Sequence, residues 1–376
     1  MIIQVCIAPE ESQGGLYRYI SDFASIAPAM TVALRSDNAS MPRAGERVIG
    51  VGKLGLVPYR RNLPAHVESP LTAAIEGASH VVCHSLYRGH VATLAAICRA
   101  RGVPYSVVAH GMLDPWTLGR YRWLKKIWFQ RGGRDAIEAA THLLFTTSRE
   151  MEKAMPAVPR AQPTLLRPAV APFADRGEQA RRRARAALGV DADVRLLIWI
   201  GRFDRMKRPL ETFRAFARSR PSRTVLAVAG FPATVQGSAI QRELAAVGPM
   251  VRYLGPVTGD RRRDLFSAAD GFVSFSFREN FGYSFAEALA HGLPCLVSSG
   301  HDLLADITGH SVGWIADAAT DRWSDCFTAF DSATDDLLAR IGAMNAAWAR
   351  EHLSVDRMRR AITSLLAPAD QRTVFA

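Results

Sequence analysis

The chain has 376 residues, of which 48% are hydrophobic and 22% are charged, a composition typical of globular proteins. No apolar run approaches the roughly 18 to 20 residues that a transmembrane helix requires, and five scattered cysteines without a CxxC pair indicate neither a disulfide framework nor a zinc site. The net charge of +12 favours an anionic partner without choosing among nucleotide, acidic lipid and nucleic acid.

The length of the chain exceeds the size at which a single hydrophobic core stops growing, so we expect two domains. The first residues, 1–7, form a strand-like run with neither a basic leader nor a small-residue cleavage site. This start predicts that the protein carries no secretory signal and remains in the cytoplasm.

The first half alternates short apolar runs with helical patterns, which predicts a parallel sheet with helices on both faces. A strand at 2–7 leads to Gly14 and Gly15 and then to a helix at 16–27. The glycine pair either lets backbone approach a diphosphate or a sugar or forms a simple tight turn, since the full GxGxxG fingerprint is missing. Further strands are predicted at 81–84, 106–109, 143–146 and 164–166, with a helix at 91–101.

Two histidines of this half come at the ends of predicted strands. His84 ends one strand, and His110 ends the next and is followed by Gly111. Residues at the carboxyl ends of parallel strands line the crevice where such sheets bind ligands, so both histidines are candidates for a site. The alternative is that each histidine is structural.

The segment 116–132 mixes aromatic and basic residues. Its candidates for a membrane or acceptor surface are Trp123, Lys125, Lys126 and Trp128. Aromatic and cationic side chains together are typical of a helix that lies on an anionic membrane. A buried aromatic face with a solvated basic face explains the same composition.

A change in amino-acid composition near residue 170 predicts a domain boundary. Prolines at 168 and 172 predict a linker, and the arginine-rich run 176–185 predicts a solvated helix that opens the second half. We therefore divide the chain into domains at 1–170 and 171–352, with a C-terminal helix and tail at 353–376 that cross back to the first domain. Asp191 and Asp193 precede a strand, so we assign this DxD triplet to a turn rather than to a metal site.

The second half repeats the alternation of strands and helices, which predicts another doubly wound domain. The strand 196–200 runs into a loop that carries Arg202 and Lys207, two cations suited to a diphosphate. Further strands are predicted at 224–229, 251–254, 271–275, 295–297 and 313–315, with helices at 210–217, 238–247, 261–269, 335–351 and 355–366.

The stretch 277–298 places two carboxylates around a turn and a helix start. Glu279 follows the strand 271–275, and Gly282 allows backbone geometry that other residues resist. Ser284 and Glu287 form a capping-box pattern, and the amides of residues 281–283 at the positive end of a helix suit a phosphate or a sugar oxygen. The alternative is that Glu287 only caps the helix and Glu279 is a solvated loop residue.

These residues resemble the retaining glycosyltransferases of group 1, also called family 4, whose GT-B architecture places two facing Rossmann-like domains around a cleft. Glu279 and Glu287 reproduce the E-x7-E signature of that family, and Gly201, Arg202 and Lys207 reproduce its GR...K loop. Residues 14–15, 109–116 and 147–150 resemble its amino-terminal landmarks. The sequence of residues 110–116 most resembles that of bacterial enzymes of exopolysaccharide, O-antigen or capsule assembly.

The resemblance implies a role for each candidate. Arg202 and Lys207 would neutralise the diphosphate of a UDP- or GDP-linked hexose, helped by the amides of Phe281, Gly282 and Tyr283. Glu279 would contact the hydroxyls of the donor sugar, and Glu287 would contact the ribose hydroxyls. Gly14 and Gly15 would also belong to the donor-binding site. His110 would line the reacting centre from the opposite domain, and the acceptor would be a glycan or a polyprenyl-diphosphate-linked glycan. The family requires neither a cofactor nor a metal.

Three other functions fit part of the sequence. The charge excess is compatible with a protein that binds nucleic acid or acidic membrane, but no nucleic-acid recognition motif accompanies it, so we expect no nucleic-acid partner. The doubly wound pattern is compatible with a nicotinamide dehydrogenase, against which the missing GxGxxG argues. A soluble synthase or phosphorylase that acts on free sugars remains open.

Overall fold

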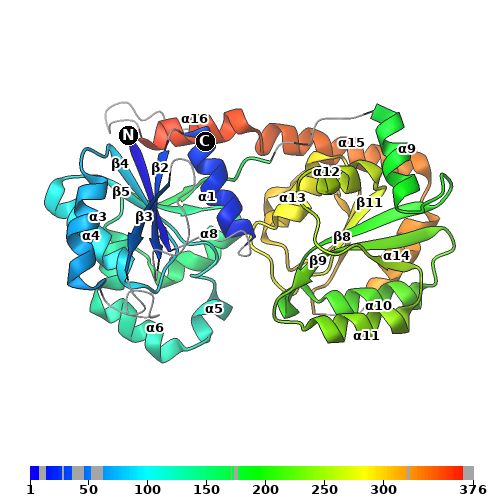
Figure 1. Ribbon diagram of the computed structural model, residues 1–376, viewed down its shortest axis with the longest axis horizontal. Coiled ribbons are helices and arrows are strands. Elements are labelled where there is room, and N and C mark those ends of the chain that lie inside the picture. Colours follow the sequence, from blue (N-terminus) through cyan, green and yellow to red (C-terminus); the bar gives the residue numbers. More distant parts are fainter. Residues whose placement is uncertain are drawn as a thin grey trace. The chain divides into compact units, whose positions relative to one another are not determined.

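The computed structural model describes residues 1–7, 14–27, 29–35, 46–51, 62–170, 172, 177–319 and 322–366. The chain divides into two compact units, Met1–Ala169 with Val355–Ala376 and Val170–Ser354, beside predicted boundaries at 170 and 352. Each unit has a parallel sheet with helices on its faces (Figure 1), so the expected fold class of two Rossmann-like α/β domains is confirmed. None of the helices in the described ranges combines the length and apolar character required to cross a bilayer.

The first unit has a seven-stranded sheet in the order β3-β2-β1-β4-β5-β6-β7, and all the recorded pairings are parallel. Its strands are β1 (Ile2–Ile7), β2 (Ala29–Arg35), β3 (Glu46–Gly50), β4 (His80–His84), β5 (Tyr105–Val108), β6 (His142–Phe145) and β7 (Pro163–Leu165). Its helices are α1 (Gly15–Ile26), α3 (Ala65–Ile75), α4 (Gly89–Arg101), α5 (Pro115–Gly119), α6 (Arg122–Trp128), α7 (Arg134–Glu138), α8 (Ser148–Ala154) and α16 (Val355–Leu366).

Alternation along β1 sends its side chains to the two faces of this sheet. Val5 packs in the large core with α3 and α4, whereas Cys6 packs with Ile20 of α1 on the opposite face. Gln4 shares the α1 face and is fully buried there. Helix α16 also belongs to this unit, since Met358 is buried and its sulfur accepts a hydrogen bond of 3.2 Å from the amide of Ala169.

The second unit has a six-stranded parallel sheet in the order β10-β9-β8-β11-β12-β13. Its strands are β8 (Arg195–Phe203), β9 (Thr224–Pro232), β10 (Val251–Tyr253), β11 (Gly271–Ser274), β12 (Cys295–Ser298) and β13 (Gly313–Ala316). Its helices are α9 (Gly177–Ala187), α10 (Pro209–Ser219), α11 (Gly237–Val247), α12 (Gly259–Ala268), α13 (Tyr283–Ala290), α14 (Trp323–Ser332) and α15 (Asp335–His352).

Two hydrophobic cores lie on the two faces of the second sheet. Helices α12, α13 and α15 contribute to one core, and α10 and α14 contribute to the other (Figure 1). Ile198 of β8 packs in the first core and its neighbour Leu197 in the second. Because the sheet is covered on both faces, its strands read as continuous apolar runs in the sequence. That is why strand 196–200 was predictable.

Two local predictions for the second unit are wrong. Strand β8 continues to Phe203, so Arg202 lies on the strand and pairs in register with Phe231, instead of on the following loop. Helix α9 is not simply solvated: Arg181 donates to Asp270 at 2.5 Å, and the buried Arg185 donates to the same carboxylate at 2.9 Å. The arginine run therefore fastens α9 to the core of its unit.

Candidate functional site

The loop after β11 is fixed at Glu279 by backbone hydrogen bonds. The amide of Glu279 donates to the carbonyl of Gly300 at 2.9 Å, and the amide of Asp302 donates to the carbonyl of Glu279 at 2.8 Å. These bonds tie the loop to the segment after the neighbouring strand β12. Glu279 therefore lies at the carboxyl edge of the sheet, where parallel sheets bind ligands.

Lys207 and Glu279 form an ion pair at this edge. Lys207 ends a short 3-10 turn, Arg205–Lys207, after β8, and its ammonium donates to the Glu279 carboxylate. The amide of Phe277 donates to the carbonyl of Met206 at 2.7 Å and holds the two loops together. The structure thus brings together two of the predicted residues that are 72 positions apart in the chain.

The pKa of Glu279 reflects two opposing effects. Burial raises it, but the charge and the hydrogen bond of the Lys207 ammonium, with a smaller contribution from the charge of Arg202, outweigh burial, so the pKa lies below its ordinary value. Glu279 is therefore a carboxylate at neutral pH. The side chains of Lys207 and Glu279 are 22% and 20% exposed, so the pair is shielded but open to a ligand.

Gly282 has a φ of +70°, a left-handed conformation that favours glycine. A Cβ at this position would lie 2.9 Å from Cγ of Glu279, so a side chain would displace the carboxylate. Helix α13 begins at the next residue, with Gly282 as its N-cap and no side-chain cap. The predicted capping box of Ser284 and Glu287 is therefore wrong, because the helix starts before Ser284.

Glu287 instead pairs with Arg262 of α12. Its carboxylate is 1% exposed and accepts hydrogen bonds from Nη2 and, at 3.4 Å, from Nε of Arg262. The same guanidinium lies 3.4 Å from the hydroxyl of Ser284. Sequence analysis missed Arg262, since a partner 25 residues away on another helix leaves no local signal.

His301 is a second residue of this edge that sequence analysis missed. It is buried, and its Nε2 lies 3.0 Å from the carbonyl of Ser274, whereas no partner of Nδ1 lies in the described part of the chain. Burial lowers its pKa to about 4, against the raising effect of the Glu279 charge, so the ring is neutral at pH 7. A signal existed, because His301 follows β12 as Glu279 follows β11.

In the first unit, His110 is held in a left-handed conformation with a φ of +49°. The amide of the next residue, Gly111, donates to Oε1 of Glu150 at 2.6 Å. Oε2 of the buried Glu150 accepts from the amide of Thr146 at 2.9 Å and from its hydroxyl at 2.8 Å. The carboxylate of Glu150 therefore fixes the backbone that presents His110 at the end of β5.

The side chain of His110 joins a buried polar chain. Its Nε2 lies 3.1 Å from Nδ1 of His84, and Nε2 of His84 lies 2.8 Å from Oε1 of Gln4. The ring of Tyr19 packs edge-on against His110, with centroids 5.2 Å apart. Burial lowers the pKa of His110 to about 3, and burial together with its histidine neighbours lowers the pKa of His84 well below its ordinary value.

The predicted donor-binding glycines lie at the start of α1. Gly14 is the N-cap with a φ of +61°, and Gly15 is the first residue of the helix. The rest of the loop, residues 8–13, lies outside the described residues.

The predicted surface at 116–132 is only partly exposed. Trp123 is 62% exposed and Lys126 is exposed, but Trp128 is 1% exposed and packs against Tyr87. Lys125 is 4% exposed, and its ammonium donates to the carbonyl of Thr117. The assignment of Lys125 and Trp128 to the surface is wrong, because the short helix α6 turns these two residues inward.

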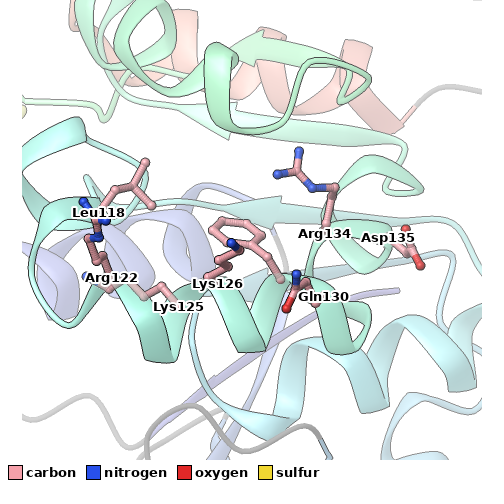
Figure 2. Close-up of a pocket in the computed structure, with 8 residues that line it drawn as sticks. Leu118, Arg122, Lys125, Lys126, Gln130, Arg134 and Asp135 are labelled. Carbon is pink, nitrogen blue, oxygen red and sulfur yellow. The ribbon is translucent and has the colours of Figure 1, made fainter.

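A cavity of about 540 Å³ opens beside α6. Figure 2 shows its lining residues, which are Leu118, Arg122, Lys125, Lys126, Phe129, Gln130, Arg134 and Asp135. Four of these side chains are cationic and one is acidic. The cavity therefore combines an excess of positive charge with an apolar contribution from Leu118 and Phe129.

Residues 180–330 match the family model described as "Glycosyl transferases group 1". This range lies in the second unit and includes Arg202, Lys207, Glu279 and Glu287. Over the matched range, the second unit is therefore similar to group 1 glycosyltransferases. All the residues of its candidate site lie within one matched segment.

Curated relatives match less than half of the chain. A D-inositol 3-phosphate glycosyltransferase of Streptomyces scabiei is 33% identical over 184 residues, which cover 45% of this chain and 40% of that protein. A protein of the same name from Mycobacterium tuberculosis strain H37Ra is 32% identical over 152 residues, which cover 37% and 31%. The chain thus spans less than half the length of the curated relatives it matches.

Solved structures are similar over both units. HepE of Anabaena in complex with UDP and glucose has a TM-score of 0.75 at 14% identity and covers 97% of this chain and 98% of that chain. Sucrose-phosphate synthase of Thermosynechococcus elongatus has a TM-score of 0.70 at 14% identity and covers 97% of both chains. At these identities the similarity shows the fold, which is that of GT-B glycosyltransferases.

Proposed function

We propose that the protein is a retaining group 1 glycosyltransferase that moves a hexosyl group from a UDP- or GDP-linked sugar to a glycan or lipid-linked glycan of a bacterial surface polysaccharide. The observation that carries the proposal is the Lys207–Glu279 pair at the carboxyl edge of the second sheet. A cation and a carboxylate side by side match the two ends of a sugar diphosphate, which are an anionic leaving group and a set of hydroxyls.

In the proposed reaction, the positive charge of Lys207 and Arg202 stabilises the departing diphosphate. Charge that is fixed before the reaction lowers the barrier because it needs no reorganisation as the bond breaks. Glu279 accepts hydrogen bonds from hydroxyls of the donor sugar, and the first amides of α13 assist at the phosphate. Without a donor, the charges of Lys207 and Glu279 neutralise each other. Donor binding therefore replaces their salt bridge with contacts from Lys207 to the diphosphate and from Glu279 to the sugar hydroxyls.

Retention of configuration follows from attack on the same face of the sugar. The acceptor oxygen forms a bond to the anomeric carbon as the bond from that carbon to the phosphate oxygen breaks, and the proton of the acceptor passes to that phosphate oxygen. The resemblance at residues 110–116 assigns His110 to the reacting centre, from which water must be excluded because it otherwise hydrolyses the donor. This scheme uses neither a metal nor a cofactor.

Glu287 is proposed to hold the ribose hydroxyls of the nucleotide. Its carboxylate is already fixed by Arg262, whose guanidinium orients the oxygens and supplies the compensating charge. An ionised carboxylate has about four lone-pair sites, so pairing with arginine leaves acceptor capacity for a hydroxyl. Arg262 therefore enters the proposed site as a positioning residue.

The acceptor is proposed to bind the first unit at the cytoplasmic face of an anionic membrane. Tyr121 and Trp123 are 60% and 62% exposed, and the cations Arg122 and Lys126 line the neighbouring cavity. Exposed aromatic rings suit the interface of a bilayer, and the cations suit a lipid-linked diphosphate.

The site assignment is tested with a donor panel and point variants. Purified protein is incubated with UDP-, GDP- and ADP-linked sugars, and nucleotide release and thermal shifts are measured. Glu279→Gln and Lys207→Ala should each lower turnover by about tenfold or more, whereas Arg182→Ala, which breaks an exposed ion pair of the same unit, serves as the matched control. Unchanged rates in both site variants would remove the assignment.

The membrane contact has its own test. Lys126→Glu and Trp123→Ala should weaken sedimentation with anionic vesicles, and added salt should weaken the wild-type binding as well. Arg218→Glu makes the same charge change on an exposed position of α10 and is the control. Equal loss in the control would attribute binding to net charge alone.

A soluble synthase that acts on free sugars is the second candidate, favoured by the structural similarity to sucrose-phosphate and trehalose-phosphate synthases. Free monosaccharides and sugar phosphates are therefore included as acceptors beside lipid-linked glycans. Transfer to a free sugar at rates that vesicles do not change would favour the synthase.

A further inference from the structure

The buried chain from α1 to His110 has a fixed hydrogen-bond direction. It begins at the carbonyl of Ile20, which can only accept a hydrogen bond, and Nε2 of Gln4 donates to it at 3.2 Å. This bond orients the amide, so Oε1 of Gln4 is the atom that faces His84. A flipped amide would set two acceptor oxygens against each other.

The direction then passes through both imidazole rings. Oε1 of Gln4 is an acceptor, so Nε2 of His84, 2.8 Å away, carries the proton. A neutral imidazole has one N–H, so Nδ1 of His84 is an acceptor for the contact of 3.1 Å with Nε2 of His110. Nε2 of His110 therefore carries its proton, and Nδ1 of His110 holds a bare lone pair.

The surroundings keep both rings neutral and in place. Gln4 and His84 are fully buried, and burial is the main cause that lowers the pKa of each histidine. The ring of Tyr19 lies edge-on to both imidazoles, with centroids 5.9 Å from His84 and 5.2 Å from His110. The carbonyl of His84 also lies 2.9 Å from Nε2 of the buried His90, which fixes the end of β4.

We propose that Gln4 and His84 are positioning residues that hold His110 as the neutral tautomer protonated on Nε2, so that its Nδ1 accepts a hydrogen bond from a sugar hydroxyl. A hydroxyl can donate to this nitrogen, whereas a phosphate or carbonyl oxygen cannot. His110 is then a selector for the hydroxyl-bearing part of the substrate and not a diphosphate ligand. The tautomer is a property of the free protein, and only the identity of the hydroxyl rests on the proposed function.

The tautomer is tested by nitrogen NMR of the full-length protein labelled with ¹⁵N-histidine. The chain has ten histidines, and His110→Asn and His84→Asn spectra assign the two rings. In the wild type at pH 7, both rings should show a protonated Nε2 and an unprotonated Nδ1. A proton on Nδ1 of His110, or a doubly protonated ring at either position, would overturn the proposal without reference to any activity.

A pair of variants tests the positioning role. His84→Leu removes the acceptor for Nε2–H, so His110 should exchange between tautomers and kcat should fall about tenfold, the order of one lost hydrogen bond, with a smaller change in KM. His84→Asn places an oxygen near the position of Nδ1, so His110 should keep its Nε2 proton and kcat should exceed that of the leucine variant.

These experiments distinguish a failure of the positioning role from a failure of the proposed function. Equal kcat in the two variants, with equal melting temperatures, would overturn the positioning role. If the wild type shows the expected tautomer but no transfer, the proposed function is contradicted. The assigned direction of the hydrogen bonds from Gln4 through His84 to His110 would still hold.

Discussion

Replacement of Lys207 by methionine removes the cation of the ion pair and leaves the Glu279 carboxylate shielded from water. Both side chains are about one-fifth exposed, so the cost lies between that of a surface pair, about 0–1 kcal/mol, and that of breaking a buried one, about 3–5 kcal/mol. We expect the free energy of unfolding to fall by about 2 kcal/mol. For a unit of this size, about 2 kcal/mol lowers the melting temperature by roughly 4–8 °C.

The pH dependence of this loss has a definite sign. The folded-state pKa of Glu279 is depressed, so the pair contributes its full stability above the unfolded pKa of about 4.3 and loses it as pH falls through the folded pKa. Without Lys207, burial raises the pKa of Glu279 and the carboxylate protonates more readily. The difference in melting temperature between the wild type and Lys207→Met should therefore be largest near pH 7 and shrink toward pH 4.

The assay is calorimetric or fluorescence-monitored melting of four proteins, which are the wild type, Lys207→Met, Glu279→Gln and the double variant. The double variant has no buried unpaired charge, so it should be more stable than the sum of the single effects predicts. Additivity within about 0.5 kcal/mol, or a Lys207→Met shift that is the same at pH 7 and pH 4, would refute the assigned interaction.

Variants at three further positions probe the supports of the site. Gly282→Ala should lower stability by about 1–2 kcal/mol through its left-handed φ and its contact with Glu279, and it should weaken nucleotide binding in thermal-shift titrations; an unchanged melting temperature would contradict the geometry. Arg262→Leu should lower stability by about 3 kcal/mol because Glu287 is buried, and Arg262→Lys should recover only part of it, whereas full recovery would show that the fork geometry is unimportant. Glu150→Gln replaces one of two accepting oxygens by a donor and should cost about 1–3 kcal/mol, measured by urea unfolding; a change below about 0.5 kcal/mol would contradict the clamp.

The fold was predictable because most strands of both sheets are buried on two faces. Strands β8 and β11 contain continuous apolar runs, and β1 is apolar except for Gln4; each is followed by a loop and a helical pattern. β2 and β3 were not predicted, and β3 carries the charged residues Glu46 and Arg47. An edge strand of mixed composition gives no clear periodic signal.

The site was predictable only where strand order sufficed. Lys207 and Glu279 follow β8 and β11, which are neighbours in the sheet, so their loops meet at one edge. Arg262 was missed because its partner Glu287 belongs to another helix, and the Ser284 pattern suggested a local partner instead. Long-range ion pairs depend on helix packing, which residue spacing does not encode.

The surface of α6 illustrates a different failure. The helix has only seven residues and continues into a π-type turn at Phe129–Gly133, so no regular period separates its inner and outer faces. Trp128 and Lys125 turn inward, whereas Trp123 and Lys126 stay outside. The composition of residues 116–132 indicated an interfacial segment. Which side chains of α6 are exposed was evident only from the three-dimensional structure.

Helix α16 gives the first unit a non-contiguous chain with a bearing on biosynthesis. A ribosome releases the strands of this unit first, but the residues Met358 and Ile362 that complete its packing emerge only after the whole second unit has been made. The nascent amino-terminal half must therefore wait with an uncovered apolar patch. Truncation of the gene just after codon 354 should accordingly produce chains that chaperones retain, even though every strand of both sheets is present.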